Sequence, residues 1–530
     1  MSNTVLITTS GTGNRLGNIT QYTNKSLVRI GKKPAISYII ERYPKDAEFV
    51  VTVGYYGDQV RQFLKLVYPD RRIDFCQVDH FSGPGSSLVY SMNCAKDLLQ
   101  KPFILHVCDS IILDQFEEVS GNWCISSDRG HTEHYRTHNI LDGRLNIINE
   151  KGSSDVSHAH VGVVRVQDYE DFWNEVSELL QKSPDDTSLS DCHVINQMLR
   201  KGKKFKIVKA QKWLDIGNFQ SLRESRQAIP DRFDILDKDG ESIFIFDDKF
   251  VVKFFHDKNY IKNRVSRLKY LKHFGPRLLE NTENFYVYEF IKGDEASHFI
   301  ECKVFRHILT TVFNEYWSPI DESDDFVLKT KMFYFDKTIN RSNRFLKDNN
   351  IQDEPTVING EYVDRFEVLI QQIPEDFLCT RKKYYYHGDF VLDNIIIDGD
   401  LIKFIDWRQD FCGDVDGGDI YYDLSKLNHS LTINHDLISK NFFSIKEISS
   451  QPVKTIEVEV LRKSCHVEFE KILHQFIVEH EFDLKKVNLL TALIWINMAP
   501  LHYYPFNNFL YYFGLYNLKK SIDAIRKPTV

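Results

Sequence analysis

The first 220 residues alternate short apolar runs with loops and one clear helical stretch. Three apolar runs, at 4–8, 50–53 and 103–107, have the length and composition of buried strands. A helix is expected from Leu88 to Leu99, directly after a glycine-rich loop. Strands that alternate with helices predict an α/β domain, in which ligands bind beyond the carboxyl ends of the strands.

The second half of the chain contains two hairpin patterns. Apolar runs at 242–246 and 250–255 flank Asp247-Asp248-Lys249, and a second pair of runs flanks Asp398-Gly399-Asp400. An Asp-Gly pair between apolar runs is a strong hairpin signal, because glycine tolerates the positive φ of a tight turn. The last third of the chain is expected to be helical.

Length and charge bound the organisation. With 530 residues and 42% hydrophobic content, the chain can bury more than one core. Pro230 disfavours helix continuation, so we expect domains at 1–228 and 229–530, the second beginning near Asp231. The net charge of −8 provides no general basic field, and nucleic acid is not an expected partner.

The cysteines and the apolar runs indicate a cytoplasmic protein. The 9 cysteines show neither paired nor regular spacing, which favours reduced thiols. Met1 is followed by no signal-like segment, and no apolar run approaches the roughly 18 residues that a membrane span needs. We therefore expect small-molecule substrates and no membrane partner. The sequence does not decide between a monomer and a homo-oligomer.

The hairpin around Asp398-Gly399-Asp400 carries the strongest chemical signal. Asp389 precedes Asn394 by five residues, and the hairpin turn folds Asp406 back beside Asn394. Two oxygen ligands at one end of a hairpin, with a carboxylate on the preceding loop, suit magnesium-dependent phosphoryl transfer. In that chemistry Asn394 and Asp406 hold Mg²⁺, and Asp389 orients or deprotonates a hydroxyl.

These residues resemble a known kinase family. His387-Gly388-Asp389, Asn394 and Ile405-Asp406-Trp407 stand in the order and spacing of the aminoglycoside phosphotransferase and choline kinase family. The resemblance implies a bilobal protein-kinase-like domain, with a small lobe at about 231–292 and a large lobe at about 293–530. It also implies ATP as a substrate.

The same resemblance implies two nucleotide-binding residues in the small lobe. Lys253, in the apolar run at 250–255, resembles the strand lysine that contacts the phosphates of ATP. Glu289 opens a segment that resembles the hinge between the lobes. The sequence departs from the family pattern at one point. The expected helix at 263–274 contains no glutamate to pair with Lys253. Either another acidic residue pairs with this lysine, or the alignment with the family is shifted here.

The first apolar run leads into a loop suited to phosphate. Gly11 and Gly13 let backbone N–H groups approach a phosphate closely, and Arg15 adds a bidentate anion clamp. Lys25 follows at a short distance and can pair with phosphate at the reacting centre.

The order of these motifs resembles the sugar-phosphate nucleotidyltransferases, whose pattern is similar to GxGxRL, PKxL and GKP. The resemblance implies a Rossmann-like domain, a mixed sheet flanked by helices, with Arg15 and Lys25 at the reacting centre. Asp109 and Asp215 would be the ligands of a second Mg²⁺. Asn24 replaces the usual proline, which we expect to loosen the turn before Lys25.

The family resemblance also implies contacts to the substrates. Gly83 and Ser86 lie in a loop that resembles the segment contacting the base and the sugar of the nucleotide. Glu150, Lys151 and Gly162 match the family's contacts to the sugar and its phosphate.

The sequence thus predicts a bifunctional cytoplasmic enzyme. The C-terminal half would phosphorylate a small alcohol with ATP, and the N-terminal half would couple the phosphate to a second nucleoside triphosphate, with CTP or UTP favoured. The product would be a nucleotide-activated sugar, sugar alcohol or amino alcohol for capsule or other surface polysaccharide.

Two alternatives stay open at this point. One is a choline or ethanolamine kinase joined to a phosphocholine cytidylyltransferase. The other is a nucleotide-sensing protein in which one domain is degenerate, for which the missing helix glutamate is the support. Two unrelated activities on separate substrates are a further variant of the bifunctional reading.

Overall fold

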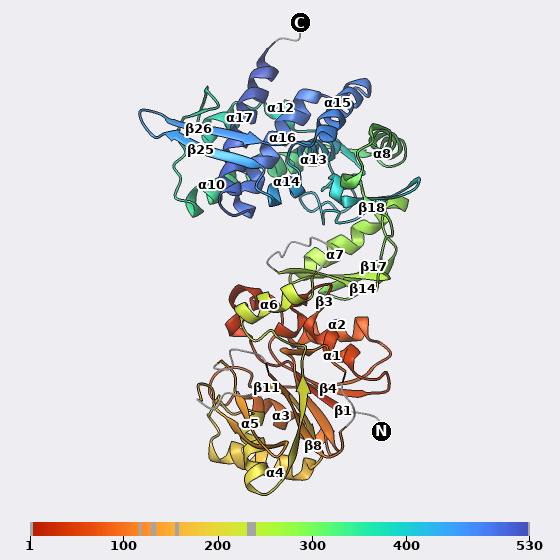
Figure 1. Cartoon of the computed structure of the whole chain (residues 1–530). Coiled ribbons are helices and arrows are strands. Elements are labelled where there is room, and N and C mark those ends of the chain that lie inside the picture. Colours follow the sequence, from red (N-terminus) through yellow and green to blue (C-terminus); the bar gives the residue numbers. More distant parts are fainter. Residues whose placement is uncertain (1–3, 116–118, 129–133, 154–157, 231–239, 528–530) are drawn as a thin grey trace. The chain divides into compact units, whose positions relative to one another are not determined.

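A computed structural model describes residues 4–115, 119–128, 134–153, 158–230 and 240–527 (Figure 1). The chain divides into two compact units: the first comprises Met1–Ile261 and Leu279–Glu289, and the second Lys262–Leu278 and Phe290–Val530. The chain therefore passes between the units three times. Each unit has a core of its own.

The first unit is built on a nine-stranded mixed sheet. Its order is β5-β4-β1-β6-β11-β8-β12-β10-β9, with β1 parallel to β4 and β6 and β11 antiparallel to β6 and β8. The strands are β1 (Thr4–Thr8), β4 (Glu48–Val53), β5 (Arg72–Gln77), β6 (Phe103–Val107), β8 (Asn122–Ser127), β9 (Thr137–Leu141), β10 (Arg144–Asn149), β11 (Ala159–Val166) and β12 (Phe205–Ala210). The three strands expected from the apolar runs are confirmed.

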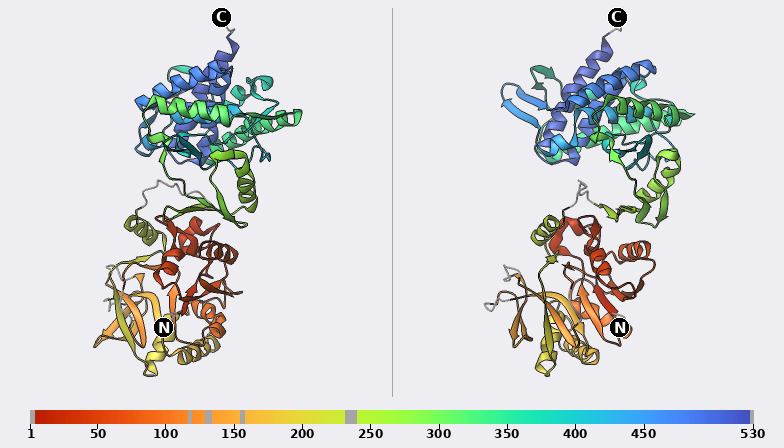
Figure 2. Two further views of the ribbon diagram at one scale, coloured as in Figure 1. Left: turned by 90° about the vertical axis from the view of Figure 1, so that its right-hand side faces the viewer. Right: turned by 45° about the vertical axis from the view of Figure 1, so that its right-hand side comes forward.

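Helices cover both faces of this sheet (Figures 1 and 2). Alternate residues of β1 point to opposite faces, so Val5 and Ile7 join one core cluster and Leu6 the other. The first cluster includes residues of α1 (Ala35–Arg42) and α2 (Gly57–Val67). The second includes residues of α3 (Leu88–Cys94), α4 (Tyr169–Lys182) and α5 (Asp191–Arg200). The expected α/β domain is confirmed.

A second, four-stranded sheet packs against α2 within the same unit. Its order is β14-β15-β17-β16, and its strands are β14 (Glu241–Phe246), β15 (Phe250–Phe255), β16 (Leu278–Asn281) and β17 (Phe285–Glu289). The ring of Phe63 lies 5.7 Å from that of Phe244 and 5.8 Å from that of Phe285, measured between centroids. The N–H of Ile245 also donates to the carbonyl of Lys32 at 2.8 Å.

The packing of this sheet bears on the domain division. The four strands fall in the expected small lobe of the kinase-like domain, yet one face of the sheet belongs to the core of the N-terminal unit. The expected limits, 1–228 and 229–530, stay a prediction. Asp231, the expected start of the second domain, lies outside the described residues.

The second unit is largely helical and encloses the hairpin singled out in the sequence. Strands β23 (Ile395–Asp398) and β24 (Leu401–Phe404) pair in the register Ile395↔Phe404, which confirms the hairpin. The main helices are α8 (Cys302–Glu315), α9 (Asp324–Lys331), α10 (Lys337–Asp348), α13 (Ile420–Thr432), α15 (Ser464–Glu479), α16 (Leu484–Met498) and α17 (Phe506–Arg526). No helix among the described residues is both long enough and apolar enough to cross a membrane.

The last third of the chain is largely helical, as expected, but it also contains a strand pair that was not predicted. Strands β25 (Phe443–Ser449) and β26 (Lys454–Val460) form an antiparallel pair there, and β26 also pairs with β20 (Thr356–Ile358). Strand β26 alternates apolar and charged residues, and its apolar Ile456 and Val458 are buried against the helices.

Replacing Phe63 by alanine tests the shared core of the first unit. Its ring contacts two phenylalanines of the four-stranded sheet, so Phe63→Ala leaves a cavity between sheet and helix. We expect the free energy of unfolding to fall by about 3–5 kcal/mol, measured by urea denaturation. The control is Lys65→Ala on the exposed side of α2, which should change it by less than about 0.5 kcal/mol. Equal effects of the two variants would contradict the shared core.

Candidate active sites

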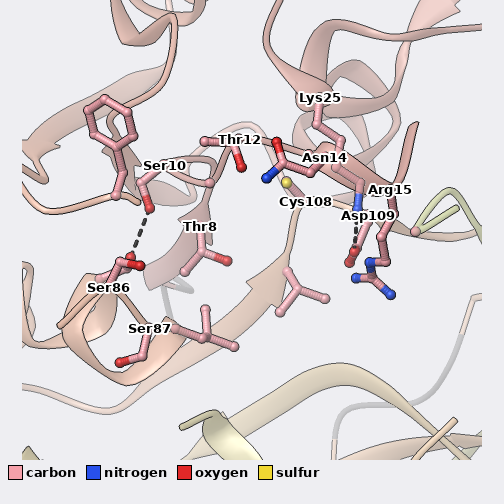
Figure 3. A pocket seen from close by; sticks show the side chains of 17 residues that line it. Thr8, Ser10, Thr12, Asn14, Arg15, Lys25, Ser86, Ser87, Cys108 and Asp109 are labelled. Atoms are coloured by element: carbon pink, nitrogen blue, oxygen red, sulfur yellow. Dashed lines mark hydrogen bonds and ion pairs between the residues drawn. The ribbon is translucent and has the colours of Figure 1, made fainter. Parts of the chain in front are cut away.

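A cavity of about 390 Å³ lies beyond the carboxyl end of β1. Its lining includes the glycine-rich loop, the loop before α3 and the end of β6, which bring together Gly11, Gly13, Arg15, Lys25, Ser86 and Asp109. Figure 3 shows Arg15, Lys25 and Asp109 at one end of the cavity and Ser86 and Ser87 at the other. The sequence-predicted residues thus converge on one hollow at the edge where α/β sheets bind ligands.

Gly13 is required by the shape of the loop. Its φ is 68°, and a Cβ there would lie 3.1 Å from Cγ2 of Thr20 and 3.2 Å from Cβ of Lys25. A larger residue would push against the lysine that lines the cavity. A Cβ at Gly11 would meet no atom within 4 Å, so packing does not require a glycine there. Its predicted contribution is to let a ligand approach the backbone N–H groups of the loop.

A partly buried ion pair lies at one end of the cavity. Nζ of Lys25 lies 2.7 Å from Oδ2 of Asp109, and the two side chains are 11% and 26% exposed. Burial alone would raise the pKa of Asp109, but attraction to Lys25 and Arg15 outweighs it and lowers that pKa. The same pairing overcomes burial in Lys25 and raises its pKa. Both groups are therefore charged at neutral pH.

The turn before Lys25 is held by Asn24, contrary to the expectation that this residue loosens it. Asn24 is fully buried, and its Nδ2 donates to the carbonyls of Thr9 at 2.9 Å and Tyr55 at 2.6 Å. Its Oδ1 accepts from the N–H and the hydroxyl of Ser26 at 2.9 and 2.7 Å. A proline could make none of these side-chain bonds. Asn24 thus ties the lysine turn to β1 and to the loop after β4.

Asp215 lies next to Asp109 through a short strand pair. Strand β13 (Trp213–Asp215) is antiparallel to β7 (Ser110–Ile112), which places Asp215 opposite Ser110. The N–H of Ile216 donates to the carbonyl of Asp109 at 3.0 Å. Oδ2 of Asp215 accepts from the hydroxyl of Tyr135 at 3.0 Å, and Oδ1 accepts from the N–H of Gly217. Two neighbouring carboxylates are the hard oxygen donors that suit Mg²⁺.

Of the other residues predicted to contact the substrates, Ser86 lines the cavity, whereas Gly83, Glu150, Lys151 and Gly162 do not. The carboxylate of Glu150 accepts from Arg136 at 2.9 Å. Burial, with repulsion from Arg15 and Arg136, lowers the pKa of Lys151, which places that lysine among the same charges. Gly162 has a φ of 76° and lies against Val107, so a Cβ would clash with that side chain at 2.5 Å. Gly83 has a φ of 81° and accepts a hydrogen bond from the hydroxyl of Ser86.

A further chain of hydrogen bonds in this unit was not indicated by any pattern in the sequence. Nε2 of His138 lies 2.8 Å from Nδ1 of His160, whose Nε2 lies 2.8 Å from Oδ2 of Asp191. Burial opposes the charge on His160, but attraction from Cys192 and Asp191 raises its pKa to about 10. The three residues come from β9, β11 and α5, and no spacing in the sequence could bring them together.

The hairpin site of the second unit has the predicted arrangement. Nδ2 of Asn394 donates to the carbonyl of Asp389 at 2.9 Å, and the N–H of Ile405 donates to the carbonyl of Asn394 at 3.0 Å. Asp406 follows directly and has a φ of 55°. The structure therefore brings Asp389, Asn394 and Asp406 to one end of the hairpin. Lys426, which the sequence analysis did not identify, lies 2.7 Å from Oδ1 of Asp389.

Asp423 holds the loop that carries Asp389. Its two carboxylate oxygens accept from the N–H groups of His387 and Gly388, both at 2.7 Å, and Oδ2 also accepts from Nε1 of Trp317. Burial raises the pKa of Asp423 to about 6, although these hydrogen bonds favour the charged form. Gly388, with a φ of 85° and Arg408 and Tyr386 close by, leaves no room for a side chain. These contacts hold the backbone of the loop that carries Asp389.

The predicted nucleotide-binding residues of the small lobe lie in β15 and at the end of β17. Lys253 is 3% exposed and sits between Ile243 and Tyr286 in a central strand, so it is not a solvent-facing lysine of an edge strand. The chain leaves the first unit after Glu289, within the segment expected to be a hinge. The nucleotide contacts of both residues stay predictions.

The helix that lacks a glutamate carries two buried arginines instead. It comprises α7 (Lys258–Arg267) and a 3₁₀ turn (Leu268–Phe274). Arg267 donates to the carbonyl of Tyr386, just before the His387-Gly388-Asp389 segment, and Nε1 of Trp407 donates to the carbonyl of Arg264 at 2.9 Å. These contacts fix the helix against both predicted motifs of the hairpin site.

No protein-family model and no curated protein matches the chain. Its N-terminal portion is similar to the CTP:phosphocholine cytidylyltransferase of Streptococcus pneumoniae, 19% identical over 43% of this chain and 100% of that chain (TM-score 0.39). A UDP-glucose pyrophosphorylase complexed with UDP-glucose is 16% identical over 43% and 98% (TM-score 0.37). The inositol-1-phosphate CTP transferase from T. maritima is 17% identical over 43% and 96% (TM-score 0.35). The resemblance of the C-terminal half to small-molecule kinases stays a prediction.

Asn24→Ala tests whether this side chain positions Lys25. The variant removes a buried donor from two carbonyls, so we expect the free energy of unfolding to fall by about 2–5 kcal/mol, measured by urea denaturation. Asn146→Ala, at an exposed position of β10, is the control and should have little effect. An equally small loss in both variants would show that the turn holds without Asn24.

Proposed function

We propose that the protein is a bifunctional enzyme that phosphorylates a small alcohol and then couples the phosphate to a nucleoside triphosphate. The first reaction uses ATP at the hairpin site, and the second releases pyrophosphate at the cavity of the first unit. The second nucleotide is CTP or UTP, and the product is a nucleotide-activated precursor for capsule or other surface polysaccharide. The substrates are a sugar, a sugar alcohol or an amino alcohol.

The observation that carries nucleotidyl transfer is the buried pair of Lys25 and Asp109 beside a glycine-rich loop. A phosphate acceptor and a nucleoside triphosphate are both anions, so their approach requires fixed positive charge. Lys25 and Arg15 supply it in a partly dehydrated cavity, where charges interact more strongly than in water. When bound between Asp109 and Asp215, Mg²⁺ would neutralise further charge of the triphosphate.

Direct transfer to the acceptor phosphate fits the side chains of the cavity better than a covalent intermediate. Cys108 lines the cavity, but burial, with repulsion from Asp109, raises the pKa of its thiol to about 12. The thiol is therefore protonated at neutral pH and a poor nucleophile. Ser10 donates to or accepts from Ser91 at 2.8 Å, and no base partner for it is found among the described residues. The role of the site is to orient and to neutralise charge.

The kinase half of the proposal is supported by the hairpin geometry. The side chain of Asp389 is 44% exposed. Its carboxylate is therefore accessible to a bound alcohol and can accept the proton of the hydroxyl. Asn394 and Asp406 present an amide and a carboxylate at the hairpin end, the donor set that suits the Mg²⁺ of ATP. Lys426, whose Nζ lies 2.7 Å from Oδ1 of Asp389, orients this carboxylate.

A choline or ethanolamine kinase joined to a phosphocholine cytidylyltransferase uses the same two reactions with another acceptor. A sensing protein with a degenerate domain is less well supported, because both sites keep their charged groups in contact: Lys25 with Asp109, and Lys426 with Asp389.

Asp109→Asn tests the first site while keeping the shape of the side chain. It removes the charge that pairs with Lys25 and that would hold Mg²⁺, so pyrophosphate release should fall about 10²–10³-fold. Phosphorylation of the alcohol should be unchanged. Asp97→Asn, at an exposed position of the same unit, is the control. Near-normal pyrophosphate release at low magnesium would exclude Asp109 as a metal ligand.

Asp389→Asn tests the second site in the same way. An amide cannot take the proton of the acceptor hydroxyl, so ATP-dependent phosphorylation should fall about 10²–10⁴-fold. Nucleotide transfer to an acceptor that is already phosphorylated should stay within about twofold of wild type, because Asp389 belongs to another core. Asp393→Asn on the same loop is the control. A folded Asp389→Asn protein that lost both activities would rule out two separate sites.

A further inference from the structure

Four basic side chains of the second unit lie close to one another, and two of them, Arg408 and Lys426, also lie near Asp389. We call the four the basic cluster: Lys337, Arg341, Arg408 and Lys426. Lys337 and Arg341 lie one turn apart on α10, Lys426 lies on α13, and Arg408 follows the Asp406-Trp407 motif. None was identified in the sequence, because α10 and α13 are about 80 residues apart and neither carries a recognisable motif.

Aromatic rings bring the members of the cluster together. Nζ of Lys337 lies 3.2 Å from the centroid of the Phe333 ring, and Cζ of Arg408 lies 4.8 Å from the same centroid. Nζ of Lys337 also lies 5.5 Å from the centroid of Tyr422, on the helix of Lys426. The rings of Phe333 and Tyr422 are themselves in edge contact at 4.9 Å.

The positive charge of the cluster exceeds the negative charge beside it. Lys426 pairs with Asp389, but among the described residues no carboxylate lies within 4.0 Å of the charged nitrogens of Lys337, Arg341 or Arg408. Arg341 donates to the carbonyl of Asn497 at 3.2 Å, and Arg408 donates to the carbonyl of Asp410 at 2.9 Å. Carbonyl oxygens and aromatic rings stabilise these cations only in part.

Like charges held together at partly buried positions oppose folding unless a ligand offsets them. Burial, with repulsion from Arg408, Arg341 and Lys426, lowers the pKa of Lys337 well below its usual value. A cluster that is unfavourable in the free protein and lies beside the proposed base is typical of a binding site for an anion.

We propose that the basic cluster binds a negatively charged group, a carboxylate or a phosphate, of the alcohol that the C-terminal half phosphorylates. The inference rests on the proposed kinase function and narrows its acceptor to anionic alcohols. The cluster contacts Asp389, the residue that meets the acceptor hydroxyl, through Lys426. Asn394 and Asp406, at the end of the hairpin, are the residues at which Mg²⁺ and the triphosphate would bind.

The proposal disfavours ammonium alcohols such as choline and ethanolamine. Their cations would be repelled by the positive groups of the basic cluster and would lose hydration on entering the site. Phe333 and Tyr422 could otherwise have served as an aromatic wall for an ammonium group, but Lys337 already lies over both rings.

The test compares acceptors that differ in charge but little in shape. The full chain is assayed for ADP formation from ATP with glycerol, glycerate, glycerol phosphate and 3-aminopropane-1,2-diol, and with glucose, glucuronate, glucose 6-phosphate and glucosamine. An anionic member of a set should have a kcat/KM about 10²-fold above its neutral counterpart, as two charge-assisted hydrogen bonds imply. Comparison of glycerate with glycerol phosphate, and of glucuronate with glucose 6-phosphate, shows whether the cluster prefers a carboxylate or a phosphate.

Variants of the cluster separate acceptor binding from ATP binding. Lys337→Met and Arg341→Met should each raise the KM of the anionic acceptor about 10–100-fold and leave the KM of ATP within about twofold. Lys347→Met, an exposed lysine on the same helix, is the matched control and should change neither. Calorimetric titration of the same acceptors in the presence of a non-hydrolysable ATP analogue measures binding without turnover.

Each outcome separates the inference from the function on which it rests. Phosphorylation that prefers a neutral or cationic acceptor would overturn the inference and leave the kinase function standing. A rise in the KM of ATP in Lys337→Met would assign the cluster to the triphosphate and likewise overturn it. Binding of an anionic alcohol that both variants weaken, without phosphorylation of any acceptor, would support the anion site and overturn the kinase function.

Discussion

The ion pair of Lys25 and Asp109 is the interaction on which the N-terminal site depends. Two opposite charges can stay partly buried only because each compensates the desolvation of the other. The surrounding structure is arranged to keep them 2.7 Å apart: Asn24 fixes the turn of the lysine, and the pairing of β7 with β13 fixes the backbone beside the aspartate. The fold itself thus holds these two charged groups in place.

Much of this site could be predicted from the sequence, because its residues follow strands. Thr4–Thr8 and Phe103–Val107 are mostly apolar runs that form neighbouring parallel strands, so the loops after them meet at one edge of the sheet. The hairpin of the second unit was predictable for a similar reason, since Asp-Gly between apolar runs fixes the register that returns Asp406 to Asn394. In both cases a short-range pattern determines where a predicted site residue lies.

Residues brought together by tertiary packing could not be predicted in this way. Asn24 seemed a weaker turn former than proline, because its partners are the carbonyls of Thr9 and Tyr55, which are distant in sequence. The chain from His138 to Asp191 and the basic cluster around Asp389 likewise combine residues of different elements. Strand β26 was missed because its alternating pattern is short and lies among long helices.

The four-stranded sheet that carries Lys253 limits how this chain could be taken apart or recombined. One face of the sheet completes the core of the first unit around Phe63, and its last strand returns to that unit after residues 262–278 have passed through the other. No single cut separates the two units, so neither is a contiguous fragment. Transfer of the second unit to another protein would have to carry residues 262–278 and 290–530 as two pieces.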